Sequence, residues 1–217
     1  MAVSSRLLSL SRKEVLRERY RGERKEKGAY RERFVLYGLR ILLRPRHEGE
    51  EHLKGFVIRR IPGKKQRKSS RHLPDIYVRY RGHFIAEIEV TGTELAWHEM
   101  VLKGRVFVLP SKARYGARKG KRYIFAFFND WEFPIGDWLL WLNGEELNKL
   151  ILKEGEIWEG ETRKGVWERY WHVPKEPFRG SGCPGGAGLL SLAHYLKWLA
   201  GLEKSPDMWA LENFMPG

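Results

Sequence analysis

The sequence predicts a mixed α/β (α+β) fold in which one β-sheet is flanked by helices. Three observations favour this class. A helical pattern comes first, short strands follow it, and the last third mixes both patterns. Hydrophobic residues make up 42% of the 217 residues, which suits one good core. No apolar run approaches the roughly 20 residues that a membrane span needs.

The first half of the chain reads as a basic arm, a helix and a series of strands. Residues 1–26 predict a basic helical arm. Residues 28–44 predict a helix whose apolar stripe contains Phe34, Gly38, Ile41 and Leu42 and is widened by Val35 and Leu39. Pro45 ends that helix. Strands are expected at 55–61, 76–80 and 84–90, with a basic loop at 62–72 and a short helix at 93–104.

The second half has a different character. Two strands are expected at 105–110 and 122–128, joined by a basic link. A helix is expected at 137–155, a Trp-rich hairpin at 156–174 and an amphipathic helix at 189–202. We therefore divide the chain into an arm (1–26), a core (27–136) and a Trp-rich C-terminal extension (137–217).

The charge balance indicates an anionic partner. The chain carries 41 Lys and Arg against 27 Asp and Glu, a formal net charge of +14. Nucleic acid is the commonest partner of such a surface. A charge-rich thermophile surface is the alternative, and the scarcity of glutamine is compatible with it. The single cysteine excludes an intramolecular disulfide framework, and without a secretory signal pattern we expect a cytoplasmic, intracellular protein.

Two neighbouring strands carry acids in an apolar context. Side chains alternate between the faces of a strand, so Glu87 and Glu89 lie opposite the apolar face of their strand. If the apolar faces of the two strands coincide, Asp75 lies across from Glu89. A two-residue turn at Arg81 and Gly82 would put Asp75 on the wrong face. The pattern therefore requires a three-residue loop or a β-bulge.

Three acids on one face suggest a cation site. Like charges at short range repel each other, and a hard divalent cation relieves the repulsion. Mg²⁺ or Mn²⁺ in such a place activates a water and stabilises charge on a phosphodiester. The alternative is a half-exposed strand whose acids face solvent or neighbouring arginines.

Four segments, in order, resemble a known family. They are "KGAYRERF", "GFVIRRIPG", "LPDIYV" and "IAEIEVTGTE", within about residues 27–94. Together they are similar to the PD-(D/E)XK nuclease core, and most similar to the archaeal Holliday-junction resolvases. The resemblance implies a restriction-endonuclease-like mixed sheet flanked by helices, usually in a homodimer, that cuts DNA, including branched DNA, with Mg²⁺ or Mn²⁺.

The resemblance also implies roles for individual residues. Glu32, Asp75 and Glu87 would be the metal ligands and, with Glu89, the catalytic acids. Arg33 and Arg60 would contact the DNA backbone. The basic loop would add further DNA contacts, from Lys64, Lys65, Arg67, Lys68 and Arg71.

One position departs from the family pattern. Glu89 stands where the family has the lysine that helps to position the attacking water. Lys112 is a candidate for a lysine that has moved to another segment, with Lys119 and Lys121 as weaker candidates, and an ordinary surface lysine is the alternative for each. Three functions therefore stay open: a metal-dependent, resolvase-like DNA endonuclease, a nucleic-acid-binding protein that has lost cleavage, and a restriction-like or viral nuclease acting on duplex DNA.

Overall fold

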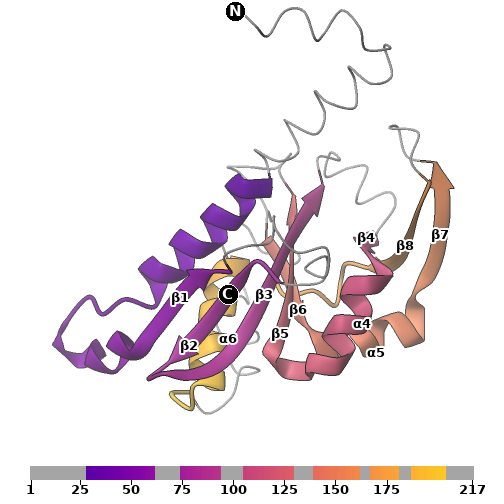
Figure 1. Ribbon diagram of the computed structural model, residues 1–217. Helices are drawn as coiled ribbons and strands as arrows, with labels where there is room; N and C mark the ends of the chain where they lie inside the picture. Colours follow the sequence, from indigo (N-terminus) through magenta and orange to yellow (C-terminus); the bar gives the residue numbers. More distant parts are fainter. Residues whose placement is uncertain are drawn as a thin grey trace, which may run out of the picture.

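The computed structural model describes residues 28–61, 74–93, 105–129, 139–161, 167–180 and 187–203. In these ranges the chain forms a five-stranded mixed sheet and a three-stranded antiparallel sheet, with helices on both faces of the larger sheet (Figure 1). The mixed α/β fold predicted from the sequence is confirmed.

The larger sheet has the strand order β1-β2-β3-β5-β6. Its strands are β1 (Phe56–Arg60), β2 (Ile76–Tyr80), β3 (His83–Thr93), β5 (Tyr123–Asn129) and β6 (Leu139–Asn143). Strands β3 and β5 run parallel, and the other neighbours are antiparallel. Parallel neighbours require a crossover connection. This crossover contains β4 (Arg105–Val108), α4 (Pro110–Lys119) and the 3₁₀ turn η3 (Gly120–Arg122).

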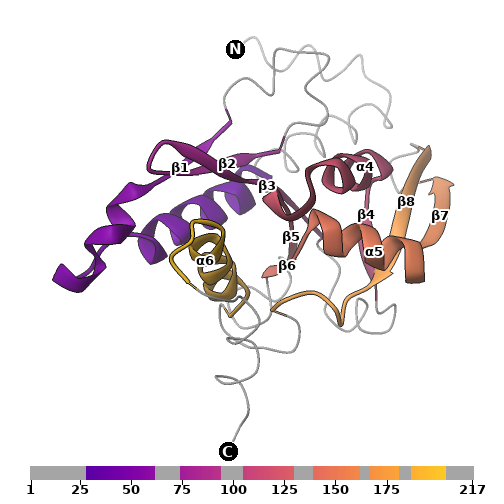
Figure 2. The same ribbon diagram turned by 90° about the horizontal axis from the view of Figure 1, so that it is seen from below.

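Helices cover both faces of this sheet (Figure 2). The helix at 28–42 and α6 (Ala187–Leu199) pack on one face, in a core that includes Leu39, Ile88 and Leu192. Helices α4 and α5 (Gly144–Glu154) pack on the other face, in a core that includes Phe125 and Leu147. The acids of β3 point toward this second face, because Glu89 is the register partner of Phe125.

Two expectations about helices were wrong. The predicted basic link after β4 is the helix α4, because its Ala, Arg and Lys residues favour a helix and Pro110 occupies the first turn. Ile41 is not in the core: its side chain is 61% exposed, while Val35 and Leu39 of the same helix are fully buried. The expected positions of Val35 and Leu39 in the buried stripe are confirmed, and Ile41 lies outside it.

The helix expected at 137–155 divides into a strand and a helix. Residues Leu139–Asn143 form β6, all five of them buried, and α5 begins only at Gly144. A short apolar run does not distinguish a buried strand from a helix. The start of α5 is fixed by a capping box, in which Asn143 accepts from the backbone N–H of Glu146 and the Glu146 side chain accepts from the N–H of Asn143.

The smaller sheet contains the predicted Trp-rich hairpin. Strands β7 (Glu156–Glu161) and β8 (Trp167–Pro174) pair in antiparallel fashion, and β4 pairs with β8. Strand β4 therefore joins the hairpin and not the larger sheet. A 3₁₀ segment, η1 (Glu48–Gly55), connects the helix at 28–42 to β1.

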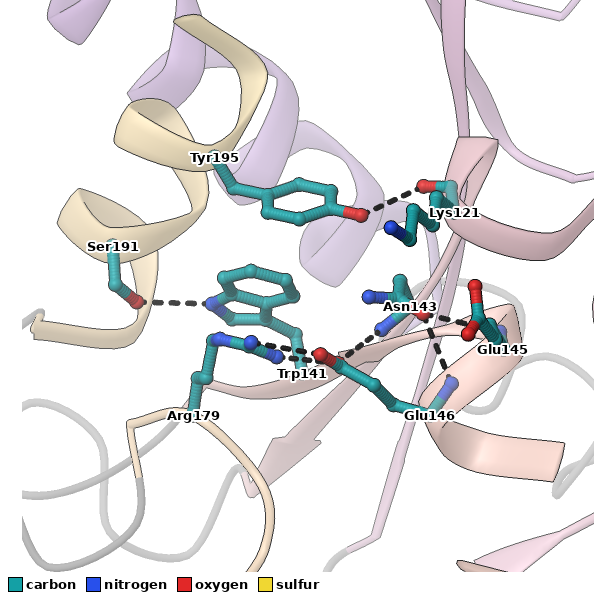
Figure 3. Close-up of polar contacts among 8 residues, drawn as sticks. All are labelled: Lys121, Trp141, Asn143, Glu145, Glu146, Arg179, Ser191 and Tyr195. Atoms are coloured by element: carbon teal, nitrogen blue, oxygen red, sulfur yellow. Dashed lines mark hydrogen bonds and ion pairs between the residues drawn. The ribbon is translucent and has the colours of Figure 1, made fainter. Parts of the chain in front are cut away.

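A polar cluster joins the C-terminal third to the larger sheet (Figure 3). Arg179 donates to both carboxylate oxygens of Glu146 and lies over the ring of Trp141, with its Cζ 4.8 Å from the ring centroid. The Trp141 Nε1–H donates to Ser191 of α6 at 3.0 Å, and the Tyr195 hydroxyl donates to the Lys121 carbonyl at 2.9 Å. Strand β6 and helix α6 thus belong to the same sheet and core as the preceding residues.

Some expectations fall outside the described residues. They concern the arm at 1–26, the basic loop at 62–72 and nearly all of the helix expected at 93–104. In the described part of the chain, no helix combines the length and the apolar character needed to cross a lipid bilayer.

Candidate active site

A β-bulge places the acids of β2 and β3 on one face. The turn at Arg81 and Gly82 has two residues, both with positive φ (46° and 83°), and it pairs Tyr80 with His83. The register then shifts between Val78 and Arg79, so that Ile76 pairs with Ile88. The residue before Ile76 therefore lies across from Glu89. The bulge, one of the two alternatives expected from the sequence, is confirmed.

Asp75 is buried and anchored by hydrogen bonds. Its side chain is at the end of β2, and the residue is 3% exposed. The carboxylate oxygen Oδ2 accepts from the backbone N–H of Val90 at 2.8 Å. Its backbone N–H donates to Ile88, and its carbonyl accepts from Ile61. The Val90 N–H thus orients the carboxylate, and the bonds with Ile88 and Ile61 fix the backbone of Asp75.

Helix α4 brings a stripe of donors to the acids of β3. Lys112, Tyr115 and Lys119 follow one another at spacings of three and four residues, which puts them on one face of the helix. Lys112 Nζ lies 2.7 Å from the Glu89 carboxylate, and both side chains are largely buried, at 17% and 7% exposure. Lys112, a candidate for a relocated lysine, thus lies beside the acids, on a helix that the sequence did not predict.

The second acid of β3 is held by the other two residues of the stripe. The Tyr115 hydroxyl donates to Glu87 at 2.8 Å, and Lys119 Nζ lies 3.5 Å from the same carboxylate. The Glu87 side chain is 14% exposed. Sequence reasoning missed Tyr115, because its segment was interpreted as a link; the three- and four-residue spacing was the signal that could have identified it.

The acids of this region raise the pKa values of two tyrosines, the buried Tyr123 and the half-buried Tyr115. Burial raises the pKa of Tyr123, and the negative charges of Glu89, Asp75 and Glu87 raise it further. Burial likewise raises the pKa of Tyr115, as does its hydrogen bond to Glu87. Both phenols therefore stay protonated at neutral pH, so Tyr115 remains a donor to Glu87.

Glu32 approaches from the helix at 28–42 and is paired with a strand residue. Its carboxylate lies 2.5 Å from Arg60 Nη2, and its side chain is 16% exposed. Arg60 precedes Ile61, whose N–H donates to the Asp75 carbonyl, so the pair lies beside the end of β2. A predicted metal ligand and a predicted DNA contact are thus partners of each other. Arg33, the other predicted contact of this region, is exposed and donates to the Ala29 carbonyl.

Within the described ranges, no group of three or more His, Cys, Asp or Glu side chains is arranged to hold a metal ion. The three predicted ligands, Glu32, Asp75 and Glu87, do not form such a group, and each makes the protein contact given above. The donor chemistry of Asp75 and Glu87 still suits a hard cation, since carboxylate oxygens are the preferred protein ligands of Mg²⁺. The five basic-loop residues lie outside the described residues.

Comparisons with known proteins include a similarity to a solved structure. No protein-family model matches the chain, and no curated protein matches it. Among solved structures, the chain is similar to D212, a nuclease from a fusselovirus, at 18% sequence identity and a TM-score of 0.46. The match covers 80% of this chain and 93% of that one.

Proposed function

We propose that the protein is a metal-dependent DNA endonuclease that hydrolyses phosphodiester bonds at the acidic face of β2 and β3. The observation that carries the proposal is the contact between Lys112 of α4 and Glu89 of β3. The contact places the largely buried ammonium group of Lys112 beside the acids. The resemblance leads one to expect a lysine on the strand itself, at the position that Glu89 occupies.

The proposed cofactor is Mg²⁺ or Mn²⁺. Mg²⁺ usually binds proteins through one or two carboxylates, while waters and substrate phosphates complete its shell, so two acids are sufficient. Asp75 and Glu87 would hold the ion, and Glu32 would join them only by releasing Arg60. When bound, such an ion activates a water and stabilises negative charge on the phosphoryl group.

The residues around the ion would have separate tasks. Asp75 is positioned by Val90, so its carboxylate is fixed before any ligand arrives. Lys112 would stabilise negative charge that develops on the phosphodiester, because a cation in a water-poor site acts more strongly than one in solvent. Glu89 would orient Lys112 through the 2.7 Å contact, and Tyr115 would orient Glu87.

The charge of the whole chain supports a nucleic-acid substrate. A net charge of +14 favours association with a polyanion, in a salt-dependent manner. Branched DNA, including the four-way junction, is the substrate that the sequence resemblance favours, and a homodimer would suit its symmetry.

The test is cleavage of labelled DNA by the parent protein and by Asp75→Asn. Asparagine retains an oxygen that can accept from Val90, so the variant loses the charge but keeps the anchoring hydrogen bond. A four-way junction and the matching duplex are incubated with Mg²⁺, Mn²⁺ or EDTA. We expect cleavage with a metal ion, none with EDTA and none by Asp75→Asn. Equal cleavage of junction and duplex would instead favour the restriction-like alternative.

A second candidate function is nucleic-acid binding without cleavage. The observation that favours it is that Glu32, Glu87 and Glu89 are each paired with a cationic side chain. A divalent ion would have to compete with these partners for the carboxylates. Tight DNA binding with no cleavage under any of the metal conditions would establish this candidate and eliminate the first.

A further inference from the structure

The outer face of the helix at 28–42 carries a regular stripe of tyrosines and arginines. Tyr30, Arg33, Tyr37, Arg40 and Arg44 follow at alternating spacings of three and four residues. At 3.6 residues per turn, the four that lie in the helix, from Tyr30 to Arg40, fall within about 80° of arc, and Arg44 follows two residues after the helix ends. All five are exposed, with the Tyr30 residue at 42% and the Tyr37 residue at 55%. The core contacts of this helix do not account for the stripe.

A basic cavity continues the stripe at its C-terminal end. It has a volume of about 670 Å³ and lies between the end of this helix, η1 and β1, at the free edge of the larger sheet. Its lining contains five arginine and lysine side chains, from Arg40, Arg44, Arg46, Lys54 and Arg59. Glu51 is the one acid among the lining residues, and it pairs with Lys54.

Arg40 connects the stripe to the cavity and is held in place. Its Nε and Nη2 donate to the carbonyl of Ile58 at 3.0 and 2.8 Å. Its guanidinium also lies over the ring of Tyr37, with Cζ 5.8 Å from the ring centroid. Since these contacts fix its position in the absence of a ligand, binding an anion here costs little side-chain entropy.

We propose that this stripe and the basic cavity together form a binding track for a single-stranded nucleic-acid segment. Exposed tyrosines on a positively charged surface stack unpaired bases, while arginines contact the phosphates. Paired bases inside a duplex do not offer their faces to Tyr30 and Tyr37. The track therefore selects unpaired nucleotides, such as a single-stranded flank or the opened strands at a branch point.

A second copy of the chain is a less suitable occupant of this surface. A twofold dimer places the same patch of each subunit against its copy. Here that symmetry would bring together two patches that each carry Arg33, Arg40 and Arg44. Ile41 beside the stripe is exposed and apolar, but a single such residue does not offset that repulsion.

The track adjoins the Glu32–Arg60 pair of the candidate active site. Glu32, on the inner face of the same helix, precedes Arg33 of the stripe, and Arg59 of the cavity precedes Arg60, the partner of Glu32. A nucleic-acid strand on the track would therefore pass the Glu32–Arg60 pair, while the acids of β3 lie on the other face of the sheet. As a description of substrate binding, this inference rests on the proposed nuclease function, but binding itself does not require cleavage.

The test measures binding by fluorescence anisotropy in EDTA, so that no cleavage interferes. The probes are labelled oligo-dT, oligo-U and a blunt hairpin duplex. The key variant is Tyr30→Leu/Tyr37→Leu, and the matched control is Tyr30→Phe/Tyr37→Phe, which retains both aromatic rings. We expect the Leu pair to weaken single-strand binding about tenfold or more and the Phe pair to retain it, while duplex binding stays unchanged. Tyrosine-dependent binding of either single strand supports the track.

The basic part of the track is tested by the salt dependence of binding. Arg44→Gln/Arg59→Gln should reduce the slope of log affinity against log salt by about 0.7 for each phosphate that the protein no longer neutralises. Arg169→Gln, at an exposed arginine of β8 in the other sheet, is the control and should leave the slope near that of the parent protein. Equal slopes for the two arginine variants would contradict a localised track.

Three further outcomes separate the possible explanations. Unchanged oligonucleotide binding by the Leu pair overturns the track. If sedimentation shows that the Leu pair alters the oligomeric state while binding persists, the surface is a protein interface and the inference is wrong. Tyrosine-dependent binding in a protein that cleaves no DNA supports the track and refutes only the proposed nuclease function.

Discussion

Removing Lys112 should expose the energetic consequence of burying Glu89. The pair is shielded from water: the Glu89 side chain is 7% exposed and that of Lys112 is 17% exposed. Breaking a buried pair by removing one partner usually costs about 3–5 kcal/mol, because the other charge is left unpaired. The residual exposure of Lys112 places this pair at the lower end, so Lys112→Met should lower the unfolding free energy by about 3 kcal/mol.

Two features distinguish this cost from a loss of packing. As the pH is lowered, protonation of the unpaired carboxylate should reduce the deficit. The double variant Lys112→Met/Glu89→Leu should recover most of the stability, because it removes both charges and keeps similar volumes.

Urea unfolding followed by tryptophan fluorescence measures these differences. For an m-value of about 3 kcal/mol/M, the single variant should unfold at a urea concentration about 1 M lower than the parent. A deficit below about 0.5 kcal/mol at neutral pH would place the pair with surface ion pairs and refute the reasoning.

Two other predictions concern the close packing of α4 against α5 and the ionisation of Tyr115 and Tyr123. A Cβ at Gly144 would overlap the carbonyl oxygen of Gly116 in α4. Gly144→Ala should therefore lower the unfolding free energy by about 1–3 kcal/mol and reduce cleavage, because it displaces α4. The control Gly49→Ala, whose Cβ would meet no atom within 4 Å, should change neither. Wild-type stability and cleavage in Gly144→Ala, by urea unfolding and nuclease assay, would show that α4 tolerates the shift. Because the pKa values of Tyr115 and Tyr123 are raised above the ordinary 10.0, the stability they contribute is complete below about pH 10 and declines as the pH rises further. In a pH titration followed by phenolate absorbance, these two tyrosines should ionise at higher pH than exposed tyrosines. Ionisation of all tyrosines of the folded protein over the same pH range would contradict this.

The arrangement of the acids could be predicted because it follows from the two-residue period of a strand. The turn at Arg81 and Gly82 and the apolar faces of β2 and β3 required different registers, so the conflict itself predicted a bulge. The same period placed Asp75 opposite Glu89 from the sequence alone.

The elements whose side chains contact the acids could not be predicted in the same way. Helix α4 has a short, strongly basic sequence with a glycine in its interior, features that also describe a loop. Its position is set by the crossover between β3 and β5, a long-range constraint that local periodicity does not contain. The pairing of Glu32 with Arg60 likewise depends on the packing of a helix against an edge strand.

The residues of β6 were assigned to a helix for a related reason. Its apolar residues are buried on both faces and show no alternation, and they precede a good helix sequence. The sequence Asn143-Gly-Glu-Glu contains the capping-box signal that separates the strand from α5, and a search for that signal would have found the boundary.

Cleavage of a labelled DNA junction by the parent protein and by Asp75→Asn tests the central claim most directly. The account predicts cutting that requires Mg²⁺ or Mn²⁺, and that is lost in Asp75→Asn while DNA affinity and folding stay intact. Undiminished cutting by Asp75→Asn, or DNA binding with no cutting by the parent protein under any metal condition, would contradict it.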